Sequence, residues 1–342
     1  MAKIEDGGKG GLVIRAVMDE KYYTNVPTVD VNVAILNSSK NISKVVKKLN
    51  EILPVPRLQH LKRVKKFEGR FFVILDFVRN EEGEKEQDVE NEKNTISRKR
   101  PKLDESMYLQ KLKAKGVNCE ELGIDGVETC QVPKEGPKTR AQYEKSMQLW
   151  PVNFHPEKKV EAMLSDTIFD DAERMHHLNS MQQVLKMADE RKKNVALVVD
   201  FKSGQTIAMG YDRTEHHPLQ HAVMVAVDAV ASTQNGGAWD LPFDELKPSK
   251  ESTPCRKDEL PEGNPDSCKA FDDQAPYLCT GCDLYVEREP CVMCAMSLIH
   301  SRIARVFFHV RDAARGALVS RCQIHTIKDL NHHYEVFEIV KI

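Results

Sequence analysis

The sequence predicts an α/β protein: a three-layer α/β/α domain with a central mixed sheet over residues 157–342, preceded by a small α+β domain over residues 1–80. The larger domain is predicted from its segments, which alternate between helical and strand patterns. The smaller one is predicted from β-branched segments around one amphipathic helix. Residues 81–156 are predicted to form a charged linker and irregular connector, because 81–93 hold seven acidic residues and almost nothing apolar that could build a core.

The smaller domain and its connector contain five patterned segments. Leu12–Val17 and Val29–Leu36 are predicted strands because of their β-branched content, and Phe71–Val78 is a predicted buried strand. Ile42–Leu53 is a predicted helix, because its apolar residues recur every three or four positions. A helix is also predicted near 103–115, with irregular sequence from there to about residue 150.

The larger domain begins with a predicted amphipathic helix over Asp170–Lys192. Five prolines and three glycines without periodicity mark 233–275 as a loop insertion. The other predicted elements are hairpin strands over Val195–Asp200 and Thr206–Gly210, a helix over Leu219–Ala231, a strand over Tyr277–Val286, a helix opening at Pro290, and strands over Arg305–Val310 and His333–Val340.

Composition excludes several classes of protein. No apolar run approaches the ~20 residues of a membrane span, and the first ten residues lack a signal sequence, so we expect neither membrane insertion nor secretion. Nine cysteines, an odd number, favour metal binding and buried thiols over a disulfide framework. The net charge is −2, yet residues 40–70 carry ten basic side chains against two acidic ones, a net of +8. The basic cluster Arg98–Lys102 is either a nuclear import signal or an ordinary charged loop.

A metal centre is predicted from three residues. Proline is favoured at the first position of a helix, so Pro290 places Cys291 and Cys294 on one face of the first helical turn. The exposed N–H groups there favour thiolates, the form that binds zinc. His221 lies on the preceding predicted helix and can meet both sulfurs if the helices lie side by side on the sheet. These ligands leave a fourth tetrahedral position for water or another group. Taken singly, the cysteine pair could be structural or redox-active and the histidine a surface or core residue.

A second C-x-x-C pair, Cys279 and Cys282, has together with Cys291 and Cys294 the spacing of a compact zinc ribbon. We expect no such site, because residues three apart on a strand point to opposite faces, and Cys279 is interpreted as a buried thiol.

The metal motif also carries a resemblance. A histidine followed two residues later by glutamate, together with P-C-x-x-C, is the signature of zinc nucleobase deaminases. The chain resembles, more specifically, the non-catalytic subunit of the eukaryotic heterodimeric tRNA wobble-adenosine deaminase, within the cytidine/deoxycytidylate deaminase superfamily. The segments that carry the resemblance are Leu53–Val64, Leu219–Met224, Tyr277–Val286, Glu289–Met296, Ile299–Ile303 and Asp329–His333.

The resemblance implies a function for each part of the chain. The domain at 157–342 would bind Zn²⁺ and pair with a catalytic subunit, and 1–80 would bind tRNA. The two subunits together would convert adenosine to inosine at position 34 of the anticodon. This chain would serve as scaffold and tRNA recruiter, in the nucleus and cytoplasm. The apolar residues Ala295, Met296, Leu298 and Ile299 would form either the subunit interface or the core.

Position 223 departs from the pattern of an active deaminase. Val223 stands where such an enzyme has the glutamate that takes a proton from the metal-bound water, and valine cannot transfer protons. We therefore predict that this chain has no catalytic residue of its own. The alternatives are an autonomous deaminase with a relocated proton shuttle, starting from Glu215, Glu287 or Glu289, and a zinc-stabilised protein-interaction module without an RNA role.

Two further predictions concern ligands. Lys62, Arg63, Lys65 and Lys66 are predicted to contact tRNA phosphates, although a basic segment can equally be a solvated face. Arg302 and Arg305 are further candidates for anticodon contacts, with a structural ion pair as the equal alternative. The short apolar segment Phe337–Ile342 motivates the hypothesis that the terminal carboxylate of Ile342 is the fourth zinc ligand, with water as the alternative.

Overall fold

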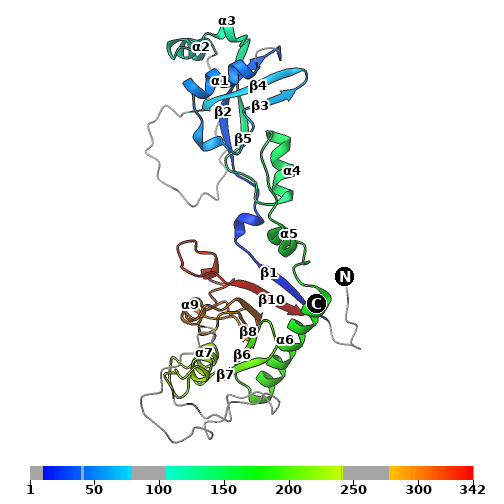
Figure 1. Ribbon diagram of the computed structural model, residues 1–342, viewed down its shortest axis with the longest axis vertical. Coiled ribbons are helices and arrows are strands. Elements are labelled where there is room, and N and C mark those ends of the chain that lie inside the picture. The colour runs from blue at the N-terminus through cyan, green and yellow to red at the C-terminus, as the bar shows by residue number, and fades with distance from the viewer. Residues whose placement is uncertain (1–10, 40–41, 79–104, 240, 242–276, 342) are drawn as a thin grey trace, which may run out of the picture. The chain divides into compact units, whose positions relative to one another are not determined.

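The computed structural model describes residues 11–39, 42–78, 105–239, 241 and 277–341, which form two compact units (Figure 1). One unit spans Glu20–Glu161. The other combines the chain up to Asp19 with the chain from Ala162 onward, and it carries the predicted metal ligands. No helix in the described ranges has both the length and the apolar character to cross a membrane.

The second unit is built on a six-stranded mixed sheet in the order β1-β10-β9-β8-β6-β7. β8, β9 and β10 run parallel, and the remaining pairings are antiparallel, including the hairpin between β6 and β7. The strands are β1 (Leu12–Val17), β6 (Val195–Asp200), β7 (Thr206–Tyr211), β8 (Cys282–Arg288), β9 (Arg305–Val310) and β10 (Glu335–Lys341).

Helices cover both faces of this sheet, which confirms the predicted three-layer α/β/α architecture. α6 (Asp171–Arg191) packs on one face, where a core of aliphatic and aromatic side chains includes Phe307 and Phe337. α7 (Ala222–Thr233) and α9 (Val292–His300) pack on the other face over a second core. α6 begins with a capping box between Asp170 and Glu173, in which each side chain accepts a hydrogen bond from the other's backbone N–H.

Strand β1 corrects the predicted domain boundary. Leu12–Val17 is a strand as predicted, but it pairs with β10 at the edge of the larger sheet, from Leu12 opposite Lys341 to Val17 opposite Val336. Ile14 is buried in the α6-side core, so this strand belongs to the second unit although it lies near the start of the chain. Local sequence patterns carry no information on which sheet a strand joins.

The unit at Glu20–Glu161 contains a four-stranded sheet in the order β3-β4-β2-β5. α1, α2 and α3 pack over one core, and a second core surrounds Trp150. The elements are β2 (Thr28–Leu36), α1 (Ile42–Ile52), β3 (Val64–Phe67), β4 (Arg70–Phe77), α2 (Glu105–Ala114), α3 (Cys119–Leu122), β5 (Gly126–Pro133) and α4 (Arg140–Leu149), with α5 (Lys158–Leu164) at the border of the two units.

The prediction of an irregular connector over 81–156 is wrong for its second half. The helix near 103–115 is present as α2, but α3, β5 and α4 follow it. β5 pairs antiparallel with β2 along its whole length and therefore completes the smaller domain. Its sequence, GVETCQVP, lacks the apolar alternation by which strands are recognised, because its middle residues are only partly buried. Residues 79–104 lie outside the described ranges, and with them the acidic stretch and the Arg98–Lys102 cluster.

A second strand was missed at 64–67, within the basic segment. β3 forms a hairpin with β4 through Glu68 and Gly69, both of which have positive φ (48° and 80°). Two positive φ values are typical of the type I′ turn that matches the twist of a hairpin. The insertion at 233–275 lies mostly outside the described residues, and α7 extends two residues beyond its predicted end, to Thr233.

Candidate metal centre

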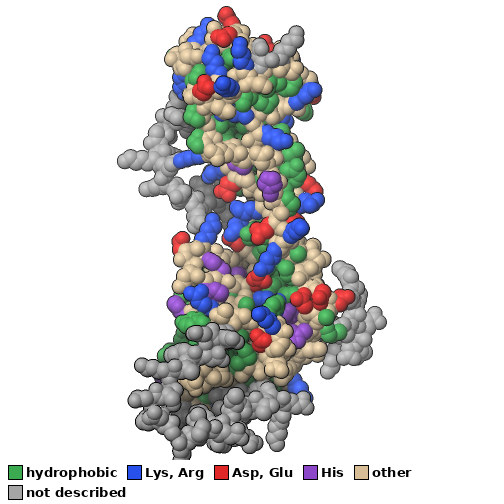
Figure 2. All heavy atoms as spheres, in the orientation of Figure 1, with side chains coloured by type: hydrophobic (Ala, Val, Ile, Leu, Met, Phe, Trp, Pro, Cys, Tyr) green, Lys and Arg blue, Asp and Glu red, His purple; other side chains and the backbone are tan. Residues whose placement is uncertain are grey.

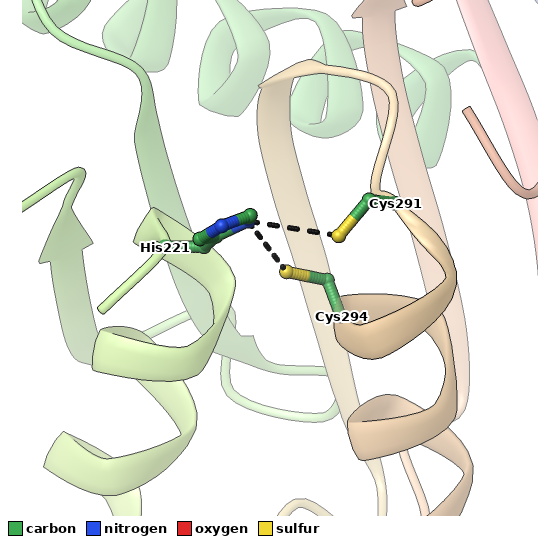
Figure 3. Close-up of side chains that lie close together, drawn as sticks. All are labelled: His221, Cys291 and Cys294. Atoms are coloured by element: carbon green, nitrogen blue, oxygen red, sulfur yellow. Dashed lines mark hydrogen bonds between the residues drawn. The ribbon is translucent and has the colours of Figure 1, made fainter. Parts of the chain in front are cut away.

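The three predicted metal ligands converge in the second unit. His221 Nδ1 lies 3.6 Å from Sγ of Cys291 and 3.6 Å from Sγ of Cys294, and one ligand atom from each residue lies within 4.8 Å of the others (Figure 3). Bonds of ~2.3 Å to sulfur and ~2.0 Å to nitrogen at a tetrahedral angle place those atoms about 3.6 Å apart, so the arrangement fits zinc. In the described part of the chain, this is the one cluster of three histidine, cysteine or acidic residues close enough to hold a metal ion.

Helix N-termini position these ligands, but both helices begin later than predicted, at Ala222 instead of Leu219 and at Val292 instead of Pro290. His221 and Cys291 are the N-cap residues of α7 and α9, so both have extended backbone and precede the first turn. Pro290 stands before the cap and not at the first helical position, because the backbone of Cys291 pairs with Gly316 in an isolated β-bridge. Cys294 lies in the first turn of α9 and is buried. Two helix N-termini thus direct their positive dipole ends toward one point, where thiolates are favoured.

The two thiols share their charge unequally. A hydrogen bond from the Cys294 thiol lowers the pKa of Cys291 to about 5, although partial burial opposes the shift. The same hydrogen bond, together with burial, raises the pKa of Cys294. The site thus favours a thiolate at Cys291, and a bound zinc ion would be held by both sulfurs as thiolates.

A buried carboxylate supports the loop beside Cys291. Glu289 is 3% exposed and accepts hydrogen bonds from the backbone N–H groups of Asp312, Leu318, Val319 and Ser320 and from the Ser320 hydroxyl. Burial disfavours its charged form, but these donors outweigh burial and hold the pKa of Glu289 below its ordinary value. A Cβ at Gly316 would lie 2.2 Å from the Glu289 carboxylate, so only glycine fits there. Glu289, which the sequence suggested as a substitute base, therefore holds this loop in place.

Comparisons with known proteins agree with the two-unit architecture. Residues 171–310 match the cytidine and deoxycytidylate deaminase zinc-binding region, and residues 29–150 match the N-terminal domain of tRNA-specific adenosine deaminase TAD3. A zebrafish (Danio rerio) protein named "Probable inactive tRNA-specific adenosine deaminase-like protein 3" is 36% identical over 318 residues, which are 89% of this chain and 84% of that protein. This chain belongs to the TAD3 family.

Other TAD3 relatives match over shorter regions. The human protein of the same name as the zebrafish one is 40% identical over 60% of this chain and 60% of its own length. The Saccharomyces cerevisiae tRNA-specific adenosine deaminase subunit TAD3 is 28% identical over 69% of this chain and 66% of its own length. The match at 29–150 includes β5 and α4, which lie within the segment predicted to be a connector.

In the TAD3 centre, an apolar residue stands at position 223, where an active deaminase would carry its proton-shuttling glutamate. Val223 is the second residue of α7, and its side chain is 2% exposed within the core between α7, α9 and the sheet. Both carboxylate oxygens of Glu289 accept hydrogen bonds from backbone N–H groups of the loop that it supports. Glu215 is exposed and forms an ion pair with Lys193. The structure therefore gives no support to a relocated base at either glutamate.

The second cysteine pair does not lie on one strand. Cys279 sits in the turn before β8, and Cys282 is the first residue of that strand, which begins five residues later than predicted. The premise that both residues occupy a strand was therefore wrong, because Leu278 and Gly281 adopt positive φ in a turn. Burial raises the pKa of Cys279 to about 11 and that of Cys282 to about 12. Both are neutral buried thiols, as predicted for Cys279.

The predicted RNA contacts divide into two groups. The guanidinium of Arg63 donates hydrogen bonds to the carbonyls of Ile74 and Leu53 and to Asn50, so its role is structural. Lys65 donates to the carbonyl of Leu149 at the end of α4 and lies over the rings of Phe67 and Trp150. In contrast, Lys62, Lys66 and Arg302 are exposed. Figure 2 shows basic side chains spread over the visible face of the smaller unit with acidic ones between them.

Two remaining predictions concern the apolar residues of helix α9 and the last residue of the chain. Ala295, Leu298 and Ile299 are buried in the core, so they are not interface residues, whereas Met296 is half-buried. Ile342, the hypothetical fourth ligand, lies outside the described residues. The segment before it is strand β10, whose side chain Phe337 belongs to the core.

Proposed function

We propose that this protein is the non-catalytic, tRNA-recruiting subunit of a heterodimeric deaminase that converts adenosine to inosine at position 34 of tRNA. One observation carries the proposal: the three metal ligands are in place around a centre whose proton-shuttle position is the buried Val223. The names of the TAD3 relatives support the tRNA substrate and the inactivity of this subunit.

Zinc is the metal that we propose for this centre. Two sulfurs and one imidazole nitrogen at tetrahedral spacing form a ligand set typical of zinc, and the matching domain is a zinc-binding region. His221 begins α7, and Cys291 and Cys294 begin α9, so one bound ion joins the ends of two helices on the same sheet face. In this subunit the ion would stabilise the fold and would not activate water for attack.

Hydrolytic deamination needs a group that moves protons between the attacking water, the base and the leaving amine. General acid–base catalysis of this kind contributes typically ~10²–10⁴-fold. Val223 has no titratable group, and Glu289 has both carboxylate oxygens engaged by backbone N–H groups. We therefore assign deamination to a partner subunit.

The smaller unit supplies the proposed tRNA contacts. Lys62 and Lys66 lie on or beside the β3–β4 hairpin and are exposed, within a segment of net charge +8. Such contacts to phosphates provide affinity without base selectivity, which is the contribution expected of a recruiting subunit. Arg63 is removed from the proposed set because its donors are used inside the domain, and Lys65 contributes charge from a fixed position.

The partner surface is proposed on the outward side of α9. Val292 is 51% exposed, and Met293 and Met296 are half-buried beside it, so the helix that carries Cys294 presents apolar side chains to solvent. Exposed apolar side chains grouped in this way are typical of protein interfaces. We propose the nucleus and cytoplasm as the compartments of the complex.

The decisive experiment measures inosine in an A34-containing tRNA after incubation with this chain, with a catalytic subunit, and with both together. We expect inosine only with both. Inosine formed by this chain alone would reject the non-catalytic assignment and favour an autonomous deaminase. Full activity of the catalytic subunit alone, with no tRNA binding by this chain, would favour a zinc-stabilised interaction module.

A further inference from the structure

The β3–β4 hairpin carries an exposed aromatic ring in a cationic setting. Phe67, the last residue of β3, is 53% exposed. The segment from Lys62 to Arg70 holds five basic side chains against one acidic side chain, that of Glu68, which gives a net charge of +4. From this arrangement we infer that Phe67 stacks on an unpaired nucleobase of the bound tRNA. The inference rests on the proposed function and adds a base contact to the phosphate contacts proposed there.

The register of the hairpin places the ring among the cations. In the antiparallel pairing of β3 with β4, Phe67 lies opposite Arg70, and Lys65 lies opposite Phe72. Side chains alternate between the two faces of a strand, so Phe67, Lys65 and Arg70 project from the same face of the hairpin. Arg70 is exposed, and it can reach a phosphate beside a base that stacks on the ring.

Lys65 fixes the ring from one side. Its ammonium nitrogen lies 5.3 Å from the ring centroid of Phe67 and 5.8 Å from that of the buried Trp150. The same nitrogen donates a hydrogen bond of 2.7 Å to the carbonyl of Leu149, at the end of α4. Lys65 therefore links the hairpin to the core around Trp150. A ring held in this way loses little conformational freedom when a base stacks on it.

The opposite face of the ring is available to a ligand. Lys65 lies over one face of Phe67, and more than half of the residue is still exposed. Phe67 belongs to neither of the two cores described for this unit, so packing gives no reason for an aromatic side chain there. Single apolar residues are common on protein surfaces. The fixed lysine and the surrounding positive charge distinguish this ring from them.

The chemistry of the site favours unpaired RNA. Aromatic side chains bind single-stranded nucleic acids by stacking on the faces of bases, while neighbouring cations contact phosphates. Within a duplex, both faces of each base are covered by the adjacent base pairs, so a side chain can stack only on a base in a loop, a bulge or an end. Every base has such a face, so Phe67 would add affinity for tRNA loops without selecting among bases.

The test compares the wild-type full-length chain with Phe67→Leu in binding to an A34-containing tRNA. Leucine keeps an apolar side chain but has no ring, so the affinity should fall about tenfold. The slope of log K against log[salt] should not change, because no charge is removed. Lys66→Gln should instead lower that slope by about one. Phe67→Tyr retains a ring and should bind as the wild type does.

A control variant and a control RNA accompany this comparison. Tyr23→Leu removes a ring that is 59% exposed in the same unit, beside Glu20 and Lys21, whose charges balance. It should change the affinity for tRNA by less than about twofold. A long RNA duplex offers almost no free base face, so the wild type and Phe67→Leu should bind it equally. The melting temperature and the zinc content report whether each variant is folded.

A fluorescence measurement detects stacking without relying on the leucine variant. Phe67→Trp places an indole at the inferred contact, and the signal of the native Trp150 and Trp239 is subtracted by means of the wild-type chain. Addition of the tRNA should quench the remaining emission, because the indole stacks on a base. The long RNA duplex should leave that emission unchanged.

Three results would overturn the inference. The first is wild-type affinity for tRNA in Phe67→Leu with no quenching in Phe67→Trp. The second is an equal loss of affinity for the tRNA and for the duplex, since the effect would then not depend on unpaired bases. The third is unchanged tRNA binding with lost capture of the catalytic subunit, which would assign the ring to a protein interface.

Failure of the inference can be told apart from failure of the proposed function. In each of the three cases, tRNA binding by the wild-type chain leaves the proposed function standing. Absence of salt-dependent tRNA binding by the wild-type chain would reject that function and the inferred base contact together.

Discussion

The two faces of the larger sheet carry polar clusters of different chemistry, a set of metal-ligand side chains on one face and an ion pair on the other. On the α7–α9 face, His221 Nδ1 lies 3.6 Å from the sulfurs of Cys291 and Cys294. On the α6 face, Arg305 forms two hydrogen bonds of 2.7 and 2.6 Å with the buried Asp283.

A histidine completes the α6-side cluster. His177 Nδ1 and the Tyr285 hydroxyl are hydrogen-bonded at 2.7 Å, and the His177 ring stacks on Phe307. The α6-side cluster thus pairs its charges within the protein, although Nε2 of His177 has no hydrogen-bond partner among the described residues. The α7–α9 cluster instead combines two thiols and an imidazole, the ligand set of a metal. Ligand chemistry, and not the presence of a histidine, distinguishes the site from the core.

The largest difference between the faces should follow from loss of a metal ligand. Cys294→Ser removes one sulfur from the centre, so zinc content should fall from about one ion per chain to near zero, because two protein ligands are too few for a structural site. Zinc at about 1,000 times its Kd stabilises the wild type by ~4 kcal/mol, and the variant should lose that increment. Metal analysis after dialysis and melting with and without zinc measure both effects. The neutral thiol variant Cys279→Ser is the control, and it should keep its zinc.

Breaking the α6-side cluster should cost stability without affecting zinc. Arg305→Met leaves the carboxylate of Asp283, which is 1% exposed, without its partner, at a cost of about 3–5 kcal/mol. Lys186→Met is the control, because Lys186 pairs with Glu190 and the two side chains are 78% and 61% exposed. Exposed pairs contribute about 0–1 kcal/mol. Urea unfolding separates the two variants; equal losses would show that burial does not set the difference.

Weakening the hydrogen bonds between Glu289 and its loop should cause an intermediate loss of stability, and only the α7–α9 face of the sheet should be affected. Glu289→Gln keeps the size of the side chain but replaces one acceptor oxygen by a donor that faces backbone N–H groups. We expect a loss of about 1–3 kcal/mol and a weaker zinc affinity, because the loop that pairs with Cys291 is no longer fixed. Competition with a zinc chelator measures the affinity. A Glu287→Gln variant, two residues away and partly exposed, should behave as the wild type.

The sequence predicted the parts of this molecule that depend on local pattern or on specific chemistry. Periodicity located α6, α1 and the β6–β7 hairpin, and ligand chemistry brought together three residues separated by 70 positions. It could not place β1 in the distant sheet, because pairing partners are set by tertiary packing. It also could not foresee that Arg63 and Glu289 bind backbone groups, since side-chain partners depend on loops that have no periodic signal.

The smallest expected effect concerns the dependence of stability on pH, for which one buried histidine on each face of the sheet is responsible. Burial lowers the pKa of His177 to about 3 and that of His325 to about 4. Each is neutral in the folded protein below the ordinary histidine pKa of ~6.5, whereas the unfolded chain binds the proton. Stability contributed by each histidine is therefore full above pH ~6.5 and is lost as pH falls toward the folded-state pKa.

Between pH 6.5 and 5 each histidine should account for a loss of about 1.6 kcal/mol. His177→Phe and His325→Phe should each flatten the dependence of the unfolding free energy on pH by one proton, and the double variant by two, because the residues lie on opposite faces and share no partner in the described structure. Urea titrations at saturating zinc over this pH range measure the slopes. A wild-type slope in both single variants would mean that neither ring excludes its proton, and the lowered pKa assigned to each histidine would then be wrong.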